Sequence, residues 1–407
     1  MMGEFWRLTA FEYKKIFRRK SAVVAIVMLY VLSAVTCILP IIGTSYGVVT
    51  ESKYEAIMKD KAYEMALNGR ELDSGLMLEM SKAYGYIPDE AADYTYTQEY
   101  ETYARPYSSV YRLVRGGFNS SEYRFSMKEA KALTPEIADS YYEVRQQNMI
   151  YDMKNEGASD EEVKYMLECD SEVQKPFRLG YNSGYRSYIS FMYTAAVFMM
   201  FVISICVAPI FAGEYTSGAD QLLLTSKHGK RKLIYSKIFA GLSFAVFVSV
   251  TIFAIVSLIS LSIYGMEGFD TALQLIYPQV CYNVSIGKAV FMLSGIGILA
   301  CMCIASVTML LSAKMRTPFP VIIIMSLANF VPMVLNIVGN SPIVRVINKI
   351  MILFPVRMCN IWDPFSANMY GAFGSYIRPY IFMPIFAALL TIAAIPLIYR
   401  GFKNHQV

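Results

Sequence analysis

The chain has 407 residues, of which 55% are hydrophobic and only 17% are charged, and its formal net charge is +5. Soluble domains usually carry about 25% charged residues, so this composition argues against a soluble protein. The chain has only two histidines and no G-x-x-x-x-G-K-[ST] phosphate loop, which excludes a histidine-based zinc site within a membrane and an ATPase site on this chain. We therefore expect no catalytic residues and no metal site.

Residues 4–20, EFWRLTAFEYKKIFRRK, precede the first apolar run and have a two-sided pattern. At about 100° per residue, one side is aromatic and aliphatic: Phe5, Trp6, Ala10, Tyr13, Ile16 and Phe17. The other side is cationic: Arg7, Lys14, Lys15 and Arg18. This sorting predicts that residues 1–20 form an amphipathic helix in the membrane interface, with its rings in lipid. The alternative is an ordinary basic flank that orients the next helix.

Six apolar runs predict an all-α polytopic membrane protein with spans at 21–43, 188–212, 238–264, 289–313, 320–338 and 380–399. The positive-inside rule places the N-terminus in the cytoplasm, because the cations of residues 7–20, 227–237, 314–316 and 400–403 then lie inside. Six spans return the C-terminus to the same side. The basic residues follow topology and lipid, so we infer a bilayer and no nucleic acid as partner, and we expect a multi-pass protein of the cell membrane.

Residues 44–187 are too long for a simple loop and predict a mainly helical extracytoplasmic domain. Segments 126–129 and 159–162 have capping-box spacing, and Thr134 with Pro135 is typical of a helix start. Segment 51–178 holds 25 Asp and Glu against 16 Lys and Arg and is rich in tyrosine; Tyr94 and Tyr96 would allow a short strand. Such a surface could bind a cationic peptide or a wall component, but tyrosines of this kind are more often packing residues, and we name no ligand.

The polar segment 213–237 is long for a cytoplasmic turn. Gly218 can end the emerging helix and Gly229 can end a short one, which leaves about two helical turns between them. Three consecutive leucines lie there: Leu222, Leu223 and Leu224. We expect these apolar side chains to insert either into lipid or into a groove of a partner protein. Without a partner, Glu214 would form a salt bridge with a nearby cation such as Arg18 or Lys237.

Pro332 predicts a kink in the fifth span, and the broken apolar segment 341–378 predicts a re-entrant or interfacial helix on the outer side. The centres of the predicted spans contain no Asp, Glu, Lys or Arg. Proton relays and intramembrane acid catalysis need such residues, so an ion-coupled transporter and an intramembrane protease are disfavoured.

Together these features resemble the permease subunit of ABC-2 type transporters. The resemblance rests on the amphipathic N-terminal helix, six spans with both ends inside, the 213–237 turn and the broken segment before the last span. The family's first cytoplasmic turn carries, in order, Phe, Glu, Gly, paired Leu, Arg and Lys, and this chain matches at Phe211, Glu214, Gly218, Leu223, Leu224, Arg231 and Lys237. The resemblance covers the membrane parts and not residues 44–187.

The resemblance implies an ATP-driven exporter whose ATP and Mg²⁺ are bound by a separate subunit, with this chain acting as a homodimer or beside a sister permease. A coupling helix around residues 218–226 would sit in a groove of that subunit, with Glu214 paired to the N-terminal helix. The residues implied in this coupling are Glu214, Tyr215, Gly218, Leu222, Leu223, Leu224, Arg231 and Lys237. Candidate residues lining the path are Ser204, Ser326, Asn329 and Asn336. The cargo class stays open among drugs, antimicrobial peptides and lipid-linked molecules.

Two other functions remain as alternatives. A membrane-anchored receptor or sensor would use the outer domain and need no ATPase. A secondary transporter would be driven by an ion gradient, and the missing charges in the spans disfavour it.

Overall fold

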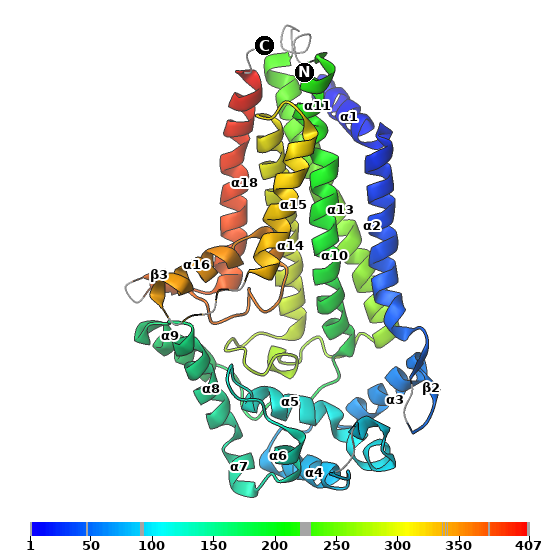
Figure 1. The fold of residues 1–407 in the computed structure, drawn as a ribbon, viewed down its shortest axis with the longest axis vertical. Coiled ribbons are helices and arrows are strands. Elements are labelled where there is room, and N and C mark those ends of the chain that lie inside the picture. The colour runs from blue at the N-terminus through cyan, green and yellow to red at the C-terminus, as the bar shows by residue number, and fades with distance from the viewer. Residues whose placement is uncertain are drawn as a thin grey trace.

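The computed structural model describes residues 2–45, 48–89, 93–219, 229–335, 337, 339, 341–372 and 375–404. These residues form an elongated, mainly helical molecule with a bundle of long helices and a smaller helical domain at one end of it (Figure 1). Helix α1 (Met2–Arg18) and the C-terminal end of α18 (Pro379–Lys403) lie at the opposite end of the bundle (Figure 1).

Five helical segments are long and apolar enough to cross a membrane: Lys20–Ile41, Ser183–Ser217, Arg231–Tyr264, Ile286–Ser312 and Pro379–Lys403. They contain α2 (Lys20–Ile38), α10 (Ser183–Val207), α11 (Pro209–Ser217), α13 (Ile234–Tyr264), α14 (Ile286–Ser312) and α18. The predicted span at 320–338 is the shorter apolar helix α15 (Pro318–Val334), which has 17 residues. A helix of that length reaches about 26 Å, at the lower limit for crossing a hydrocarbon core of about 30 Å.

Helix α10 is at the centre of the bundle. In the segment Ser183–Ser217, which contains α10, 72% of the most apolar stretch is buried, compared with 22% in the segment Lys20–Ile41. Helix α10 packs against α2, α13, α14 and α15. Small residues allow these helices to approach closely, and a Cβ added at Gly184 would lie 1.9 Å from the carbonyl oxygen of Gly265. Helix α14 packs along both α13 and α18. The bundle core is therefore built around α10 and α14.

The polar turn predicted at 213–237 is shorter in the structure. Helix α11 continues to Ser217, and Gly229–Leu233 form a helical turn that leads directly into α13. Gly218 ends α11 with φ of +67°, a left-handed conformation that suits glycine, so the predicted helix stop at this residue is confirmed. Glu214 and Lys237 consequently lie on helices rather than on a free turn.

The segment predicted at 341–378 is broken, as expected, and forms helices and a hairpin. It contains α16 (Pro342–Ile352), α17 (Pro355–Met358) and the antiparallel strands β3 (Tyr370–Ala372) and β4 (Ser375–Ile377). Pro332 lies inside α15, and its carbonyl oxygen accepts a hydrogen bond of 3.1 Å from Arg357.

The smaller domain is mainly helical, as predicted. Its elements are β1 (Thr44–Ser45), β2 (Glu51–Ser52), α3 (Lys53–Ala66), α4 (Ser74–Gly85), α5 (Ser108–Phe118), α6 (Met127–Lys131), α7 (Pro135–Asp139), α8 (Tyr141–Asn155) and α9 (Asp160–Ser171). The capping boxes that open α6 and α9 are both confirmed, as is the start of α7 at Thr134 and Pro135. Residues Tyr94–Tyr96 form a 3₁₀ turn, so the strand considered there is wrong.

Buried charged groups join this domain to the bundle side. Arg145 of α8 is fully buried, and it bonds to Asp170 at 2.8 Å and to the carbonyl oxygens of Pro278 and Val280 in the loop between α13 and α14. Helix α9 contributes Glu162, which pairs with Arg345 and Lys349 of α16. The domain is thus tied both to the α13–α14 loop and to the segment before α18.

Candidate functional site

Helix α1 folds back against α13 at the end of the bundle. It ends where Arg19 adopts an extended conformation, and α2 starts at Lys20. The side of α1 that faces the bundle buries Thr9, Glu12 and Ile16, which are three to four residues apart and so share one helix face.

The aromatic residues of α1 are divided between the bundle and the surface. The Phe5 ring packs on Phe239 of α13 at a centroid distance of 5.7 Å, and the Tyr13 hydroxyl donates to Ser243 at 2.8 Å. Trp6 and Phe17 remain about half exposed, at 53% and 46%. α13 thus covers part of Phe5 and Tyr13, and the placement of the four rings in lipid stays a prediction.

The predicted second span is divided at Ala208 into α10 and α11. Pro209 has no N–H group to continue the α10 hydrogen-bond pattern, and α11 starts at this residue. The first N–H groups of a helix lack partners within it, and here the Ser312 hydroxyl of α14 accepts from Phe211 at 3.1 Å and from Ala212 at 2.9 Å. The same hydroxyl donates to the carbonyl oxygen of Ala208 at 2.5 Å. A serine about 100 positions away thus fixes the start of α11.

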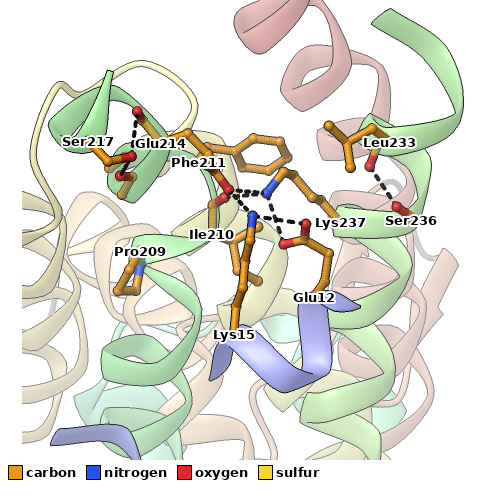
Figure 2. Close-up of polar contacts among 12 residues, drawn as sticks. Glu12, Lys15, Pro209, Ile210, Phe211, Glu214, Ser217, Leu233, Ser236 and Lys237 are labelled. Carbon is orange, nitrogen blue, oxygen red and sulfur yellow. Dashed lines mark hydrogen bonds and ion pairs between the residues drawn. The ribbon is translucent and has the colours of Figure 1, made fainter. Parts of the chain in front are cut away.

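Four charged side chains meet where α1, α11 and α13 come together, and Figure 2 shows them converging on Lys237. The Lys237 ammonium lies 2.8 Å from Glu12 Oε2 and 2.6 Å from Glu214 Oε1, and it donates to the carbonyl oxygen of Ile210 at 3.1 Å. Lys15 lies 2.6 Å from Glu214 Oε1 and 3.3 Å from Glu12 Oε1. We call these four residues, Glu12, Lys15, Glu214 and Lys237, the charge cluster.

The charge cluster is buried and electrically balanced. The side chains of Lys237, Glu12 and Glu214 are 0%, 2% and 9% exposed, and that of Lys15 is 28% exposed. Moving an isolated charge out of water is very costly, so charges at this depth need partners. An ammonium group has three N–H donors, and the three acceptors around Lys237 satisfy all of them. This arrangement requires all three helices to be in place at once.

Lys15 remains charged at the edge of the cluster. Burial opposes its charge, but the carboxylates of Glu12 and Glu214 outweigh that cost and raise the pKa of Lys15 above its usual value of 10.5. Arg19 adds a neighbouring contact, since its guanidinium donates to the carbonyl oxygen of Pro209 at 3.2 Å. Arg19, which separates α1 from α2, is thereby attached to the residue that begins α11.

The structure brings only part of the predicted coupling surface together. Glu214 and Lys237 are in the charge cluster; Tyr215 is half-buried, stacks on Phe402 of α18 and donates to the carbonyl oxygen of Ala313 at 2.9 Å. Arg231 is exposed at the start of the Arg231–Tyr264 segment. Leu222, Leu223 and Leu224 lie outside the described residues.

The remaining predicted residues are more scattered. Lys14 and Arg18 are exposed on α1, and Arg18 is not in the charge cluster, where Lys15 takes the place expected for it. Ser204 and Ser326 each donate to a carbonyl oxygen of their own helix, at 2.9 and 2.7 Å.

Asn329 of α15 differs from these serines. It is 2% exposed, and its amide has no hydrogen-bond partner among the described residues. Asn336 lies outside the described residues. The described residues also contain no group of three His, Cys, Asp or Glu side chains that could hold a metal ion.

Glu12 is the residue that the sequence reasoning missed. The sequence did contain a clue, because Glu12 is the only carboxylate among the charged residues from position 7 to position 20. The desolvation cost of burying a carboxylate in that position is offset only if a cation of another segment contacts it, as Lys237 does here. The arrangement links the N-terminal helix to both helices that flank residues 218–228.

Searches of curated proteins and of solved structures found no match to this chain. A sequence profile described as ABC-2 family transporter protein matches residues 8–362. The matched range runs from α1 through α17 and encloses residues 44–187, which the resemblance argued from the sequence had left out. The match covers most of the chain, and the chain therefore belongs to the ABC-2 family of transporter proteins.

Proposed function

We propose that this chain is the membrane-spanning permease of an ATP-driven exporter and that a separate ATP-binding subunit docks at the turn between α11 and α13. Family membership supports a multi-pass membrane transport subunit. The observation that carries the proposal further is the charge cluster, which joins α1 to both helices flanking residues 218–228. A push on that turn would move α1, α11 and α13 together rather than bend one of them.

In this proposal α15 is the sixth span and both chain ends are cytoplasmic. The ends of α1 and α18 lie at the same end of the bundle, which is consistent with an even number of spans (Figure 1). Cations gather at the helix ends on that side: Lys14, Arg18, Lys20, Arg231, Lys232, Lys314, Arg316, Arg400 and Lys403. The positive-inside rule then makes that side cytoplasmic and the 44–187 domain extracytoplasmic in the cell membrane.

The coupling step follows from the same arrangement. Residues 218–226, with Leu222, Leu223 and Leu224, would fill an apolar groove on the ATP-binding subunit, and Lys230, Arg231 and Lys232 would lie at its rim. Closure of two such subunits would drive two permease chains, identical or sister copies, from inward-facing to outward-facing. Cargo would leave through the interface of the two halves, and the buried amide of Asn329, which has no hydrogen-bond partner among the described residues, would have to be uncovered to contact it.

A gentle-detergent pull-down of the tagged full chain tests this function. We expect an ATPase with a phosphate loop to be recovered with the wild type and lost when Leu222, Leu223 and Leu224 are changed to Ser. The matched control changes Lys314 and Arg316 to Ser in the short turn between α14 and α15, and it should retain the ATPase. Recovery of no ATPase even after cross-linking would overturn the proposal and favour a receptor that uses the 44–187 domain.

A further inference from the structure

A cavity of about 220 Å³ lies at the junction between the smaller domain and the bundle. Its walls come from three places: α8, residues 277–280 of the α13–α14 loop, and residues 361–368 after α17. A second cavity of about 300 Å³ adjoins it, and Asp152, Gln279 and Trp362 line both. Ligand sites are often found where separate parts of a fold meet in this way.

Aromatic and sulfur-containing side chains make up much of the smaller cavity. Tyr277 and Trp362 form an edge-to-face pair with ring centroids 4.0 Å apart, and Phe365 lies on the same wall. Met149 and Met153 of α8 are also among its lining residues. Trp362 is 58% exposed although it is one of the largest apolar side chains, so part of its ring is available to an occupant.

The charge of the smaller cavity is negative. Asp152 lies in the last turn of α8 and Glu156 is the residue directly after that helix, and both line the cavity. The described residues that line it include no Lys, Arg or His. Two cations lie nearby: Arg124 lines the second cavity, and Arg345 of α16 is 3.4 Å from Glu156. Asp152 Oδ1 accepts a hydrogen bond of 2.7 Å from the Ser121 N–H.

We propose that this junction cavity binds an organic cation with an ammonium head group. Aromatic faces attract cations through their quadrupole, and the attraction increases where water is partly excluded. Methionine thioethers suit the methyl groups of such a head because they are polarizable and adaptable. An anion would be repelled by Asp152 and Glu156, and a neutral apolar ligand would gain no charge contact with either carboxylate.

An occupant of this cavity would bridge the three segments that form it. It would also act on α16, because Glu156 pairs with Arg345 as well as lining the cavity. Arg345 is only 4% exposed, and its Nη2 has no partner among the described residues, so this guanidinium depends on Glu156, just after α8, and on Glu162 of α9. Binding of a cation would therefore change the contact between Glu156 and Arg345, and so the position of α16 in the segment before α18.

The chain has only two tryptophans, which allows a direct test. In a Trp6→Phe background, Trp362 is the sole tryptophan and reports on the cavity. The full chain in detergent is titrated with choline, and in parallel with 3,3-dimethyl-1-butanol, its neutral isostere, at constant ionic strength. We expect a saturable change in Trp362 emission with choline and none with the alcohol.

Carboxylate variants complete the experiment. Asp152→Asn keeps an acceptor for the Ser121 N–H, and together with Glu156→Gln it should raise the half-saturating choline concentration by about two- to fivefold per charge removed. Glu136→Gln, an exposed carboxylate on α7, should leave the titration unchanged. No saturable response to choline, an equal response to the alcohol, or an unchanged titration in the carboxylate variants would overturn the site. The titration needs no partner subunit, so its outcome is independent of the pull-down.

Discussion

Replacing Lys237 with methionine tests whether the charge cluster holds α1 on the bundle. Methionine preserves much of the side-chain length but removes the positive charge and all three donors. Lys237 is 0% exposed, so water cannot replace it, and Glu12 and Glu214 would be left with Lys15 as their only cation in the cluster. Removal of one partner from a buried ion pair costs about 3–5 kcal/mol, which is a large part of the stability of a typical protein.

The assay is thermal unfolding in detergent, with Trp6 emission as a local probe of α1 in a Trp362→Phe background. The matched control is Lys232→Met, because Lys232 also pairs with α1, through Glu4 at 2.6 Å, but with both side chains well exposed at 31% and 54%. Such surface pairs contribute about 0–1 kcal/mol, so the control should melt close to the wild type.

A second substitution separates charge balance from packing. Adding Glu12→Gln to Lys237→Met removes the excess negative charge and should recover part of the lost stability, because a neutral amide is far easier to bury than an unpaired carboxylate. The reasoning is refuted if Lys237→Met melts like Lys232→Met, or if the double variant is less stable than Lys237→Met alone.

Three further predictions concern single contacts. Ser312→Ala removes the hydroxyl that serves the first turn of α11 and should lower the free energy of unfolding by about 1–3 kcal/mol, whereas Ser306→Ala loses only a bond within its own helix and should change melting little. Gly184→Ala places a methyl 1.9 Å from a carbonyl oxygen and should reduce the monodisperse yield in size-exclusion chromatography; Gly295→Ala, which meets nothing within 4 Å, should not, and equal yields would contradict the packing described. Burial opposes the charge of Glu162, but its two α16 cations lower its pKa below the usual 4.5, so its contribution to stability is present above that pH and is lost as the pH falls through the lowered value. Melting curves of the wild type and Glu162→Gln should therefore converge at acidic pH, and a difference that stays constant as the pH falls would rule this out.

Local features of the fold were predictable because their causes are local. A serine and a glutamate three residues apart cap α6 and α9, and glycine at position 218 ends α11, since each signal depends on neighbours within one helical turn. The apolar runs likewise predicted the long helices, because about 20 apolar residues in succession have few other uses. Boundaries were less accurate where polar residues remain helical, as with Glu214 and Lys237, whose charges are neutralised by a distant segment.

The candidate site was harder to predict for the same reason. Glu12 and Lys237 are 225 positions apart, and no periodic pattern in either helix relates one to the other. The family resemblance identified Glu214 and Lys237 and implied a contact of Glu214 with the N-terminal helix, but it did not supply Glu12. The junction cavity was also out of reach, because Trp362 and Asp152 come from segments whose meeting depends on how the smaller domain sits on the bundle.

The separation of Glu12 from its partners has a consequence for how the chain is made. The ribosome synthesises Glu12 long before Glu214 and Lys237, so until those residues are made Lys15 is the only cation of the cluster available to Glu12. Docking of α1 can then be completed only once α13 has been made, since Lys237 lies on that helix. The cluster thus makes the docking of the first helix a late step in folding, and chains that end before α13 should leave Glu12 without its buried partner Lys237.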